Sequence, residues 1–347
     1  MRTSPANNVV VIFGGRSEEH PVSCWSARNV ANGLKQAGYT VSYVGITRQG
    51  EFRRLEDVPS KENPRVTTED GEPFKPYQLA EFDLAFPVLH GPYGEDGSIQ
   101  GLFATLNIPY VGCSVASSAV AMDKYLLKEI CASIDIPQTP FIVVHEVELA
   151  ADEQAVIDEI TKTFDYPLFI KPVRQGSSIG ISRVTTEAQL REGLALARSL
   201  DRTIIVEPAV SRFREIECAV LGLDDPFVSV PGEIKKDADA WYDFESKYTK
   251  PAEVSYTADV DQSVIDATQQ LTKKLWAAVG MRGLARFDYF LLDDGQVLLN
   301  EVNTMPGFTP TSLYPKMIEA SGIELPDLVD RLVKCALEVA DDESWPA

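Results

Sequence analysis

The chain has 347 residues, enough for two or three domains of ordinary size. Hydrophobic residues make up 44% and charged residues 24%, which is typical of a soluble globular protein. The net charge of −20 argues against nucleic acid or an anionic membrane surface as a partner. The five cysteines are scattered, which favours a reduced cytosol, and no apolar run approaches the ~20 residues of a membrane span.

The first part of the chain predicts a βαβ unit. The apolar segments 9–13 and 40–46 predict strands, with a helix beginning near Ser23 between them. This unit indicates a parallel sheet whose ligands bind at the carboxyl ends of the strands. The loop 14–20 lies at such an end, although it lacks the glycine fingerprint of a dinucleotide site. Glu19 in this loop is most simply interpreted as a carboxylate that complements the helix dipole.

The next stretch, 51–78, is polar and predicts a surface excursion. A predicted strand at 82–89 precedes HGPYGEDG, in which three glycines indicate a tight loop. His90 in this loop is either functional or a hydrogen-bonded structural group.

A second candidate loop follows a predicted strand at 168–171. Its sequence, PVRQGSSIG, contains glycine and serine residues that leave backbone N–H groups available for phosphate oxygens. It is not a P-loop, because no Gly-Lys-Ser/Thr sequence follows. A flexible hairpin tip is the alternative, but Lys171 just before the loop favours a phosphate contact.

Three further segments are candidate nucleotide contacts. The hinge from Glu207 to Val210 offers backbone groups that can read an adenine edge. The predicted strand 215–221 places Glu215 where it can bind a ribose hydroxyl pair or simply face solvent. The long segment 231–251 is rich in Tyr, Trp, Lys and Asp, which suggests a lid, although loops of this length are sometimes disordered.

The segment 284–313 predicts a β-hairpin, because apolar runs flank an Asp-Asp-Gly turn at 293–295. If residues 294 and 295 form a two-residue turn, Asp288 lies opposite Glu301, and Arg286 lies opposite Asn303. All four side chains then share one face. A three-residue turn would shift the register by one residue and break this pairing.

Two facing carboxylates repel each other unless a cation lies between them. Asp, Glu and Asn together form an all-oxygen donor set, which suits Mg²⁺ bound to a nucleotide phosphate. The spacing is equally compatible with the solvated polar face of an edge hairpin.

Seven motifs now stand in a fixed order along the chain: GGRSEEHPVS, HGPYGEDGSIQG, MDK, FIKPVRQGSSIG, YDFESKY, RFD and NEVNTMPGFTPTSL. Together they closely resemble the D-alanine–D-alanine ligases of the ATP-grasp superfamily, over nearly the whole chain. The resemblance implies that ATP phosphorylates one D-alanine and that the amine of a second D-alanine attacks the acyl phosphate. The product, D-alanyl-D-alanine, is a precursor of the bacterial cell wall.

The resemblance also implies a nucleotide site. Lys124, Lys171 and Lys247 should bind ATP phosphates beneath the loop that carries Ser177 and Ser178. Adenine and ribose should be held by Glu207, Val210 and Glu215. Two Mg²⁺ ions, which Mn²⁺ can replace, should be bound by Asp288, Glu301 and Asn303.

For the amino acids, the resemblance implies that Glu19 holds the ammonium of the first D-alanine, with His90 nearby. Ser312 and Leu313 should receive the carboxylate of the second D-alanine. Arg286 and the backbone of Gly307 should stabilise the tetrahedral oxyanion. Catalytic roles are expected for Glu19, Ser177, Arg286 and Tyr248.

The implied fold is an α/β, three-domain ATP-grasp architecture. An N-terminal parallel-sheet domain (1–122) should bind substrate, and two α+β domains (123–214 and 215–347) should clamp ATP. The resemblance further implies a cytoplasmic homodimer whose partners are D-alanine and ATP, with no nucleic acid and no membrane insertion.

Two positions depart from common family patterns, Gln175 before Gly-Ser-Ser and Pro208 after the hinge glutamate. Pro208 has no N–H, so an adenine contact there needs a carbonyl or the N–H of Val210. A D-alanine–D-lactate ligase is the nearest alternative, but Tyr248 favours the dipeptide product. A regulator that has lost ligation and a nicotinamide dehydrogenase are more distant alternatives.

Overall fold

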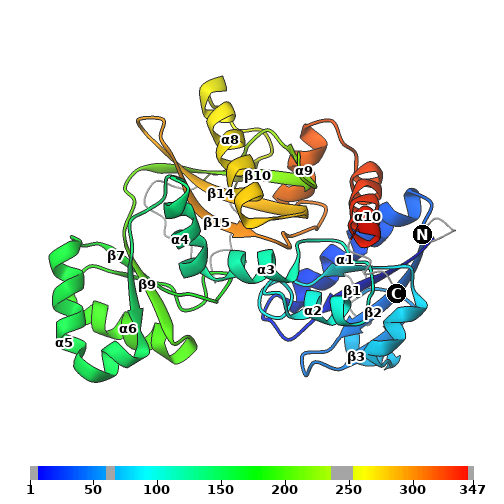
Figure 1. Ribbon diagram of the computed structural model, residues 1–347, viewed down its shortest axis with the longest axis horizontal. Coiled ribbons are helices and arrows are strands. Elements are labelled where there is room, and N and C mark those ends of the chain that lie inside the picture. The colour runs from blue at the N-terminus through cyan, green and yellow to red at the C-terminus, as the bar shows by residue number, and fades with distance from the viewer. Residues whose placement is uncertain (1–6, 60–66, 236–252, 343–347) are drawn as a thin grey trace.

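The computed structural model describes residues 7–59, 67–235 and 253–342. Within these ranges the strands form three sheets, and helices pack against each of them (Figure 1). None of the described helices is long and apolar enough to cross a bilayer. The mixed α/β class predicted from the sequence is confirmed.

The elements have the following bounds. The described helices are α1 (His20–Gln36), α2 (Ser98–Thr105), α3 (Val115–Met122), α4 (Lys124–Ser133), α5 (Glu146–Thr163), α6 (Glu187–Leu200), α8 (Gln262–Val279), α9 (Leu313–Ala320) and α10 (Leu325–Asp342), with short 3-10 helices η1 (Thr68–Asp70) and η2 (Pro76–Glu81). The described strands are β1 (Asn8–Gly14), β2 (Thr40–Ile46), β3 (Phe52–Leu55), β4 (Glu72–Pro73), β5 (Leu84–Val88), β6 (Ile142–His145), β7 (Leu168–Pro172), β8 (Ser182–Val184), β9 (Thr203–Pro208), β10 (Phe213–Gly222), β11 (Phe227–Val228), β12 (Gly232–Lys235), β13 (Glu253–Ser255), β14 (Gly283–Leu292) and β15 (Val297–Asn303).

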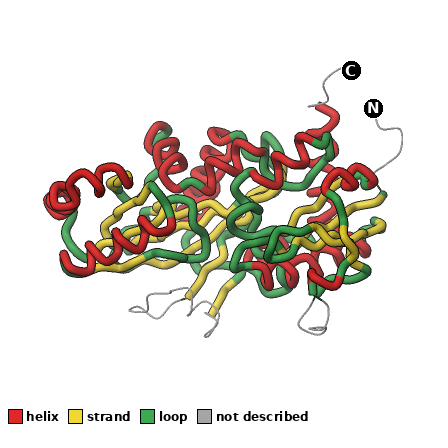
Figure 2. Tube along the Cα trace, turned by 90° about the horizontal axis from the view of Figure 1, so that it is seen from below, coloured by secondary structure: helices red, strands yellow, loops and turns green. Residues whose placement is uncertain are grey.

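The N-terminal sheet has the order β4-β3-β2-β1-β5, and its central strand β1 runs parallel to both β2 and β5. Successive side chains of β1 point to opposite faces. Val9, Val11 and Phe13 belong to the core under α1, whereas Val10 and Ile12 belong to the core on the other face. Both faces of this sheet are therefore covered by helices (Figure 2), as the predicted βαβ unit requires.

Two details of this region differ from the prediction. The stretch 51–78 is not wholly a surface excursion, because β3 and β4 extend the sheet by antiparallel pairing. Alternation explains this: Phe52 packs against one core of the sheet, and Leu55 lies in the other. In addition, α1 begins at His20 rather than near Ser23, because the proline that follows is well suited to the first helical turn.

The second sheet is antiparallel, in the order β6-β9-β7-β8. Its core face carries Leu168, Ile170, Ile204 and Val206, which pack under α5 and α6. The opposite face carries the alternate residues of β7 and β9, which include Lys171 and Glu207. Alternation thus places Lys171 and Glu207 together on the face opposite the apolar core.

The third sheet has the order β13-β12-β10-β14-β15, with β11 pairing with β10. Phe287, Tyr289 and Leu299 face the core beneath α4 and α8, together with Leu275 and Trp276 of α8. The intervening residues of β10, β14 and β15 form the polar face. The segment 231–251, predicted to be a loop, contains β12 at its start, and residues 236–252 lie outside the described structure.

Helix α10 joins the C-terminal part of the chain to the N-terminal sheet. It packs beside α1 (Figure 1) and also contacts β5, β10 and β14. Leu328, Val329 and Leu332 of α10 share one core with Val30 and Leu34 of α1. The predicted domain boundaries at 122 and 214 stay predictions.

Candidate active site

The hairpin β14–β15 shows the predicted facing pairs, but through a different turn. Leu292 N–H donates to Gln296 O over 2.9 Å, so three residues form the turn rather than two. A bulge then places two residues of β15, Asn300 and Glu301, after the Tyr289–Leu299 pair. The extra residue restores the register, so that Asp288 faces Glu301. The predicted turn was therefore wrong, and the predicted face is correct.

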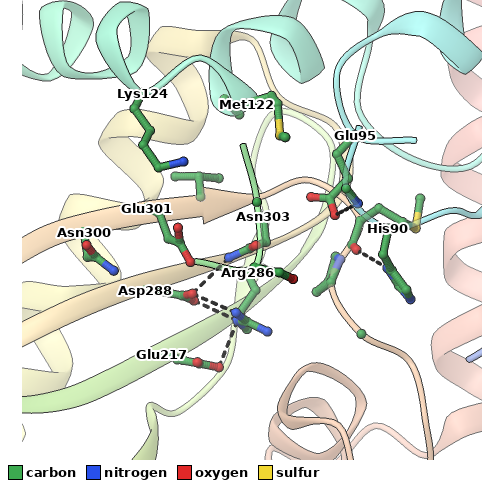
Figure 3. Close-up of a pocket in the computed structure, with 18 of the residues that line it drawn as sticks. His90, Glu95, Met122, Lys124, Glu217, Arg286, Asp288, Asn300, Glu301 and Asn303 are labelled. Atoms are coloured by element: carbon green, nitrogen blue, oxygen red, sulfur yellow. Dashed lines mark hydrogen bonds and ion pairs between the residues drawn. The ribbon is translucent and has the colours of Figure 1, made fainter. Parts of the chain in front are cut away.

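The polar groups of this face are joined by short contacts (Figure 3). Arg286 donates from Nε and Nη2 to the two oxygens of Asp288, each over 2.7 Å. Asn303 Nδ2 donates to Asp288 Oδ2 over 2.9 Å. Glu217 on β10 lies opposite Asp288, and its Oε2 is 2.9 Å from Arg286 Nε. Three neighbouring strands thus bring a guanidinium and several carboxylates together.

Negative charge exceeds positive charge within this cluster. Burial raises the pKa of Asp288 to about 6, although the Arg286 charge lowers it. Burial also raises the pKa of Glu217 well above its ordinary value. Arg286 Nε has only one hydrogen, which it donates to Asp288, so the nearby Glu217 Oε2 has no hydrogen bond within the described structure. A buried carboxylate oxygen without a donor favours the approach of a cation.

A group of lysines lies at another end of the site. Glu207 is buried between Lys128 and Lys171, with a separation of 2.6 Å to each Nζ atom. Burial raises the pKa of Glu207, but the two lysine charges outweigh that effect and lower it to about 2. Lys124 at the start of α4 donates to the carbonyl of Gln175 over 2.6 Å. These lysines concentrate positive charge in an acidic protein, as a polyphosphate site requires.

The Gly-Ser-Ser loop follows β7 directly. Ser177 and Ser178 both have left-handed backbone conformations, with φ of 50° and 59°. Such conformations are uncommon for residues with a Cβ atom and concentrate at functional sites. Gly176 and Ser177 line the same cavity as Lys124 and Lys171. The predicted phosphate loop is thus placed beside the lysines.

The N-terminal loops form the remaining wall. Glu19 is the residue before α1, where its carboxylate can complement the helix dipole as predicted. Its side chain also lies close to Gly91 and lines the cavity. Burial lowers the pKa of His90, and burial together with the Glu19 charge raises the pKa of Glu95 to about 8. Gly307 and Leu313, from the segment after β15 and the start of α9, complete this wall.

One cavity of about 460 Å³ connects these three groups. The predicted residues that line it are Glu19, His90, Lys124, Lys171, Ser177, Glu207, Glu215, Arg286, Asp288, Glu301, Asn303, Gly307 and Leu313. Ser178, Val210 and Ser312 are described but are not among the lining residues. Lys247 and Tyr248 lie outside the described residues, so the lid predictions that involve them stay predictions.

Sequence reasoning missed several residues of the site. Lys128 lies one turn beyond Lys124 on α4, and this spacing was a usable signal for a second inward-facing lysine. Glu95 is buried between the His90 loop and the segment after β15, which no local pattern indicates. Asn300 lines the cavity only because the bulge turns it there.

Comparison with known proteins agrees with this geometry. Family models described as the D-ala D-ala ligase N-terminus and C-terminus match residues 8–113 and 130–334. The chain belongs to the D-alanine–D-alanine ligase family. Members of this family are ATP-dependent ligases of cell-wall synthesis that use D-alanine, ATP and divalent metal ions.

Solved structures of ligases cover almost the whole chain. VanG D-Ala:D-Ser ligase from Enterococcus faecalis is 33% identical, with a TM-score of 0.85 over 96% of this chain and 100% of that one. The D-alanine-D-alanine ligase from Coxiella burnetii is 32% identical, with a TM-score of 0.80 over 98% of this chain and 96% of that one. D-alanyl-alanine synthetase A from Vibrio cholerae is 27% identical, with a TM-score of 0.80 over 96% of this chain and 100% of that one. The predicted ATP-grasp ligase fold is therefore confirmed.

The hairpin face of the ligase suits a divalent metal by its donor chemistry. No three His, Cys, Asp or Glu side chains are grouped as metal ligands in the described part of the chain, so the amide of Asn303 would have to complete the set with Asp288 and Glu301. Carboxylate and amide oxygens are the donors that Mg²⁺ prefers. Glu217 Oε2 has no hydrogen-bond donor within the described structure, which leaves a buried acceptor for a cation on this face.

Proposed function

We propose that this ligase joins two molecules of D-alanine to form D-alanyl-D-alanine at the expense of ATP. One observation carries the proposal: a single cavity connects the lysines of β7 and α4 with the carboxylate and guanidinium face of the hairpin and with the N-terminal wall of Glu19 and His90. A triphosphate and an amino acid can therefore meet within one cavity.

In the first step, a carboxylate oxygen of the first D-alanine attacks the γ-phosphorus of ATP, and ADP leaves. The protein's contribution to such a transfer is position and positive charge. Lys124 and Lys171 would hold the phosphates, and Ser177 and Ser178 would cover them. The side chain of Glu207 is already bound by two lysines, so the hinge would contact adenine through its backbone, with Val210 and Glu215 beside it.

The divalent metal, most simply Mg²⁺ held by Asp288, Glu301 and Asn303, would neutralise phosphate charge when bound. Lys247 would reach the same phosphates from the lid. Arg286, which now neutralises Asp288, is placed to turn toward the reacting carboxyl group.

In the second step, the neutral amine of the second D-alanine attacks the acyl carbon. The bond from carbon to the phosphate oxygen breaks, phosphate leaves, and the nitrogen releases one proton. Glu19 would bind the ammonium of the first D-alanine, beside His90. The N-terminus of α9, at Ser312 and Leu313, would receive the carboxylate of the second D-alanine, since helix N-termini favour anions. Arg286 and the Gly307 backbone would stabilise the oxyanion.

Tyr248, Ser177 and Glu19 would link the lid to the substrate site, an arrangement that favours dipeptide formation. We also propose the domain limits 1–122, 123–214 and 215–347, with the cavity between them. A cytoplasmic homodimer is the state expected from the family resemblance.

D-serine is a second candidate for the second substrate, because a relative of 33% identity is described as a D-Ala:D-Ser ligase. D-lactate is a weaker candidate, and no described residue favours it.

The experiment is a comparison of acceptors. ATP-dependent phosphate release is measured with D-alanine alone and with added D-serine, D-lactate or L-alanine, and the products are identified by mass. We expect D-alanyl-D-alanine as the main product, with a rate that rises from pH 6 to 9 as the attacking amine loses its proton. A main product containing D-serine or D-lactate would replace the proposed substrate pair, and phosphate release without D-alanine would reject the proposal.

A further inference from the structure

The segment from Thr304 to Phe308 connects β15 with α9 and carries Gly307, but its hydrogen bonds are made to the N-terminal part of the chain. Thr304 Oγ1 donates to the carbonyl of Glu95 over 3.2 Å. Met305 O receives a bond of 2.8 Å from His90 Nδ1. The shape of this segment is therefore set from outside its own sheet.

The last residue of the segment, Phe308, is held in the same way. Its N–H donates to Ser26 Oγ over 3.0 Å, and its carbonyl accepts a bond of 3.0 Å from Asn29 Nδ2. Both acceptor and donor lie on α1. Gly307 thus lies between two residues, at 305 and 308, that are each bonded to the N-terminal part of the chain.

The directions of these bonds follow from the chemistry of His90. Its Nδ1 faces a carbonyl oxygen, which can only accept, so Nδ1 must carry the proton. Burial keeps the ring neutral by lowering its pKa, which leaves Nε2 as an acceptor. Ser26 Oγ lies 3.0 Å from Nε2 and therefore donates its only hydrogen there, while its lone pair accepts from Phe308 N–H.

A protonated His90 would not fit this arrangement. Ser26 Oγ would then face two donors, and its own hydrogen would lose its acceptor. Two charges that act on the ring oppose each other, because Glu19 favours the protonated ring and Arg286 disfavours it. One unbroken chain of donors and acceptors runs from Phe308 through Ser26 and His90 to Met305.

We propose that Ser26 is a positioning residue of the ligase. Its hydroxyl orients His90 and, together with that ring, holds both ends of the Met305–Phe308 segment. The Gly307 backbone therefore has a fixed position in the cavity. Ser26 is fully buried and is not among the residues that line the cavity, so it acts through its neighbours. The proposal rests on the function proposed above, in which Gly307 contacts the reacting carbonyl group. Displacement of such a group by about 1 Å can lower a rate by ~100-fold.

The chain offers a matched control in Ser23, which lies on the same helix and is equally buried. Ser23 Oγ also makes two hydrogen bonds, accepting from Gly14 N–H over 2.7 Å and donating to the carbonyl of Val88. Its partners lie at the ends of β1 and β5 and not in the 304–308 segment. Ser26→Ala and Ser23→Ala therefore remove the same number of bonds from comparable sites.

The test compares these two variants. Ser26→Ala should lower kcat for dipeptide formation by ten- to a hundredfold, with a KM for ATP within about twofold of wild type, because the lysine end of the cavity is untouched. Ser23→Ala should lower the melting temperature about as much as Ser26→Ala does, and its kcat should stay within about twofold of wild type. Equal kcat values for the two variants, or a Ser26→Ala protein with wild-type kcat, would overturn the proposal.

Nuclear magnetic resonance gives a second readout that needs no activity. The chain has only three histidines, so the His90 ring nitrogens can be assigned from their loss in His90→Gln. We expect a protonated Nδ1 and an unprotonated Nε2 in the wild type. Ser26→Ala should shift the Nε2 signal and the Gly307 amide signal, and Ser23→Ala should shift neither.

The two readouts separate the two proposals. If the wild type makes no dipeptide, the proposed function fails, and the Gly307 amide still shows whether Ser26 sets the position of this segment. A Gly307 amide that does not move in Ser26→Ala, or a wild-type ring protonated at Nε2, would reject the positioning role even in an active ligase.

Discussion

At the scale of single residues, the two ends of the cavity differ in their ratio of positive to negative side chains. Glu207 has two lysines for one carboxylate, whereas the hairpin face sets Arg286 among Glu217, Asp288 and further carboxylates. Burial alone would lower the pKa of Arg286, but these carboxylates raise it. The lysine end of the cavity thus favours binding of an anion, and the hairpin face favours binding of a cation.

The lysine arrangement predicts the effect of removing Lys128. In Lys128→Met, Glu207 loses one of its two counter-ions while it remains buried, so the free energy of unfolding should fall by roughly 3 kcal/mol. Lys316→Met is the control, since Lys316 forms a partly exposed pair with Glu319 and should cost less than about 1 kcal/mol. Urea denaturation at pH 7 measures both, and equal losses would show that Lys128 contributes no more than a surface pair.

Glu95 predicts a pH dependence of stability. Its pKa is about 8 in the folded protein against an ordinary value of 4.5, so between these pH values the folded state retains a proton that the unfolded state has released. Stability should therefore fall as pH rises through this window, by at most about 1.4 kcal/mol per pH unit from this group. Glu95→Gln cannot ionise and should lack this part of the slope. Stability curves of the two proteins that stay parallel from pH 5.5 to 7.5 would contradict the prediction.

At the scale of elements, the loop after β5 is limited by close packing. A Cβ atom on Gly94 would lie 2.2 Å from the carbonyl oxygen of Leu89, which belongs to the backbone and cannot move aside cheaply. Gly94→Ala should therefore displace the neighbouring His90 and Glu95. We expect a loss of about 1–3 kcal/mol in stability and a marked loss of ligation.

A matched control lies close by in the helix α2. Gly101 is helical and has open space where a Cβ would be, so Gly101→Ala should stabilise the protein by roughly 0.5–1 kcal/mol. Thermal unfolding and dipeptide formation are measured for both variants. A change of stability in the same direction in both variants would contradict close packing at Gly94.

The hairpin shows how far sequence reasoning reaches at this scale. Alternation of apolar and polar residues identified the face that carries Arg286, Asp288, Glu301 and Asn303, because a period of two is visible in the sequence itself. The turn length was not predictable, since Asp-Asp-Gly fits two or three central residues. The bulge at Asn300 shifts the register by one residue and so brings Asp288 opposite Glu301 despite the longer turn. Nothing local in the sequence signals a bulge at an asparagine.

At the scale of the whole molecule, motif order predicted the family, and most of the described residues that it predicted for the site line the cavity. These residues lie in short recognisable segments. Contacts between distant segments were not predictable. The Lys128–Glu207 pair joins α4 to β9, and the Ser26–His90–Met305 chain joins three parts of the sequence. Such pairs depend on how the sheets are placed against one another, which no local period encodes.

The central claim is that the hairpin face holds the metal-bound triphosphate next to an amino-acid carboxyl group. D-alanine-dependent ADP formation by Glu301→Gln tests it most directly, with Asp293→Asn at the exposed turn of the same hairpin as the control. We expect Glu301→Gln to lose activity by at least ~100-fold with an unchanged melting temperature, and Asp293→Asn to keep wild-type activity. Wild-type turnover by a folded Glu301→Gln protein would contradict the claim.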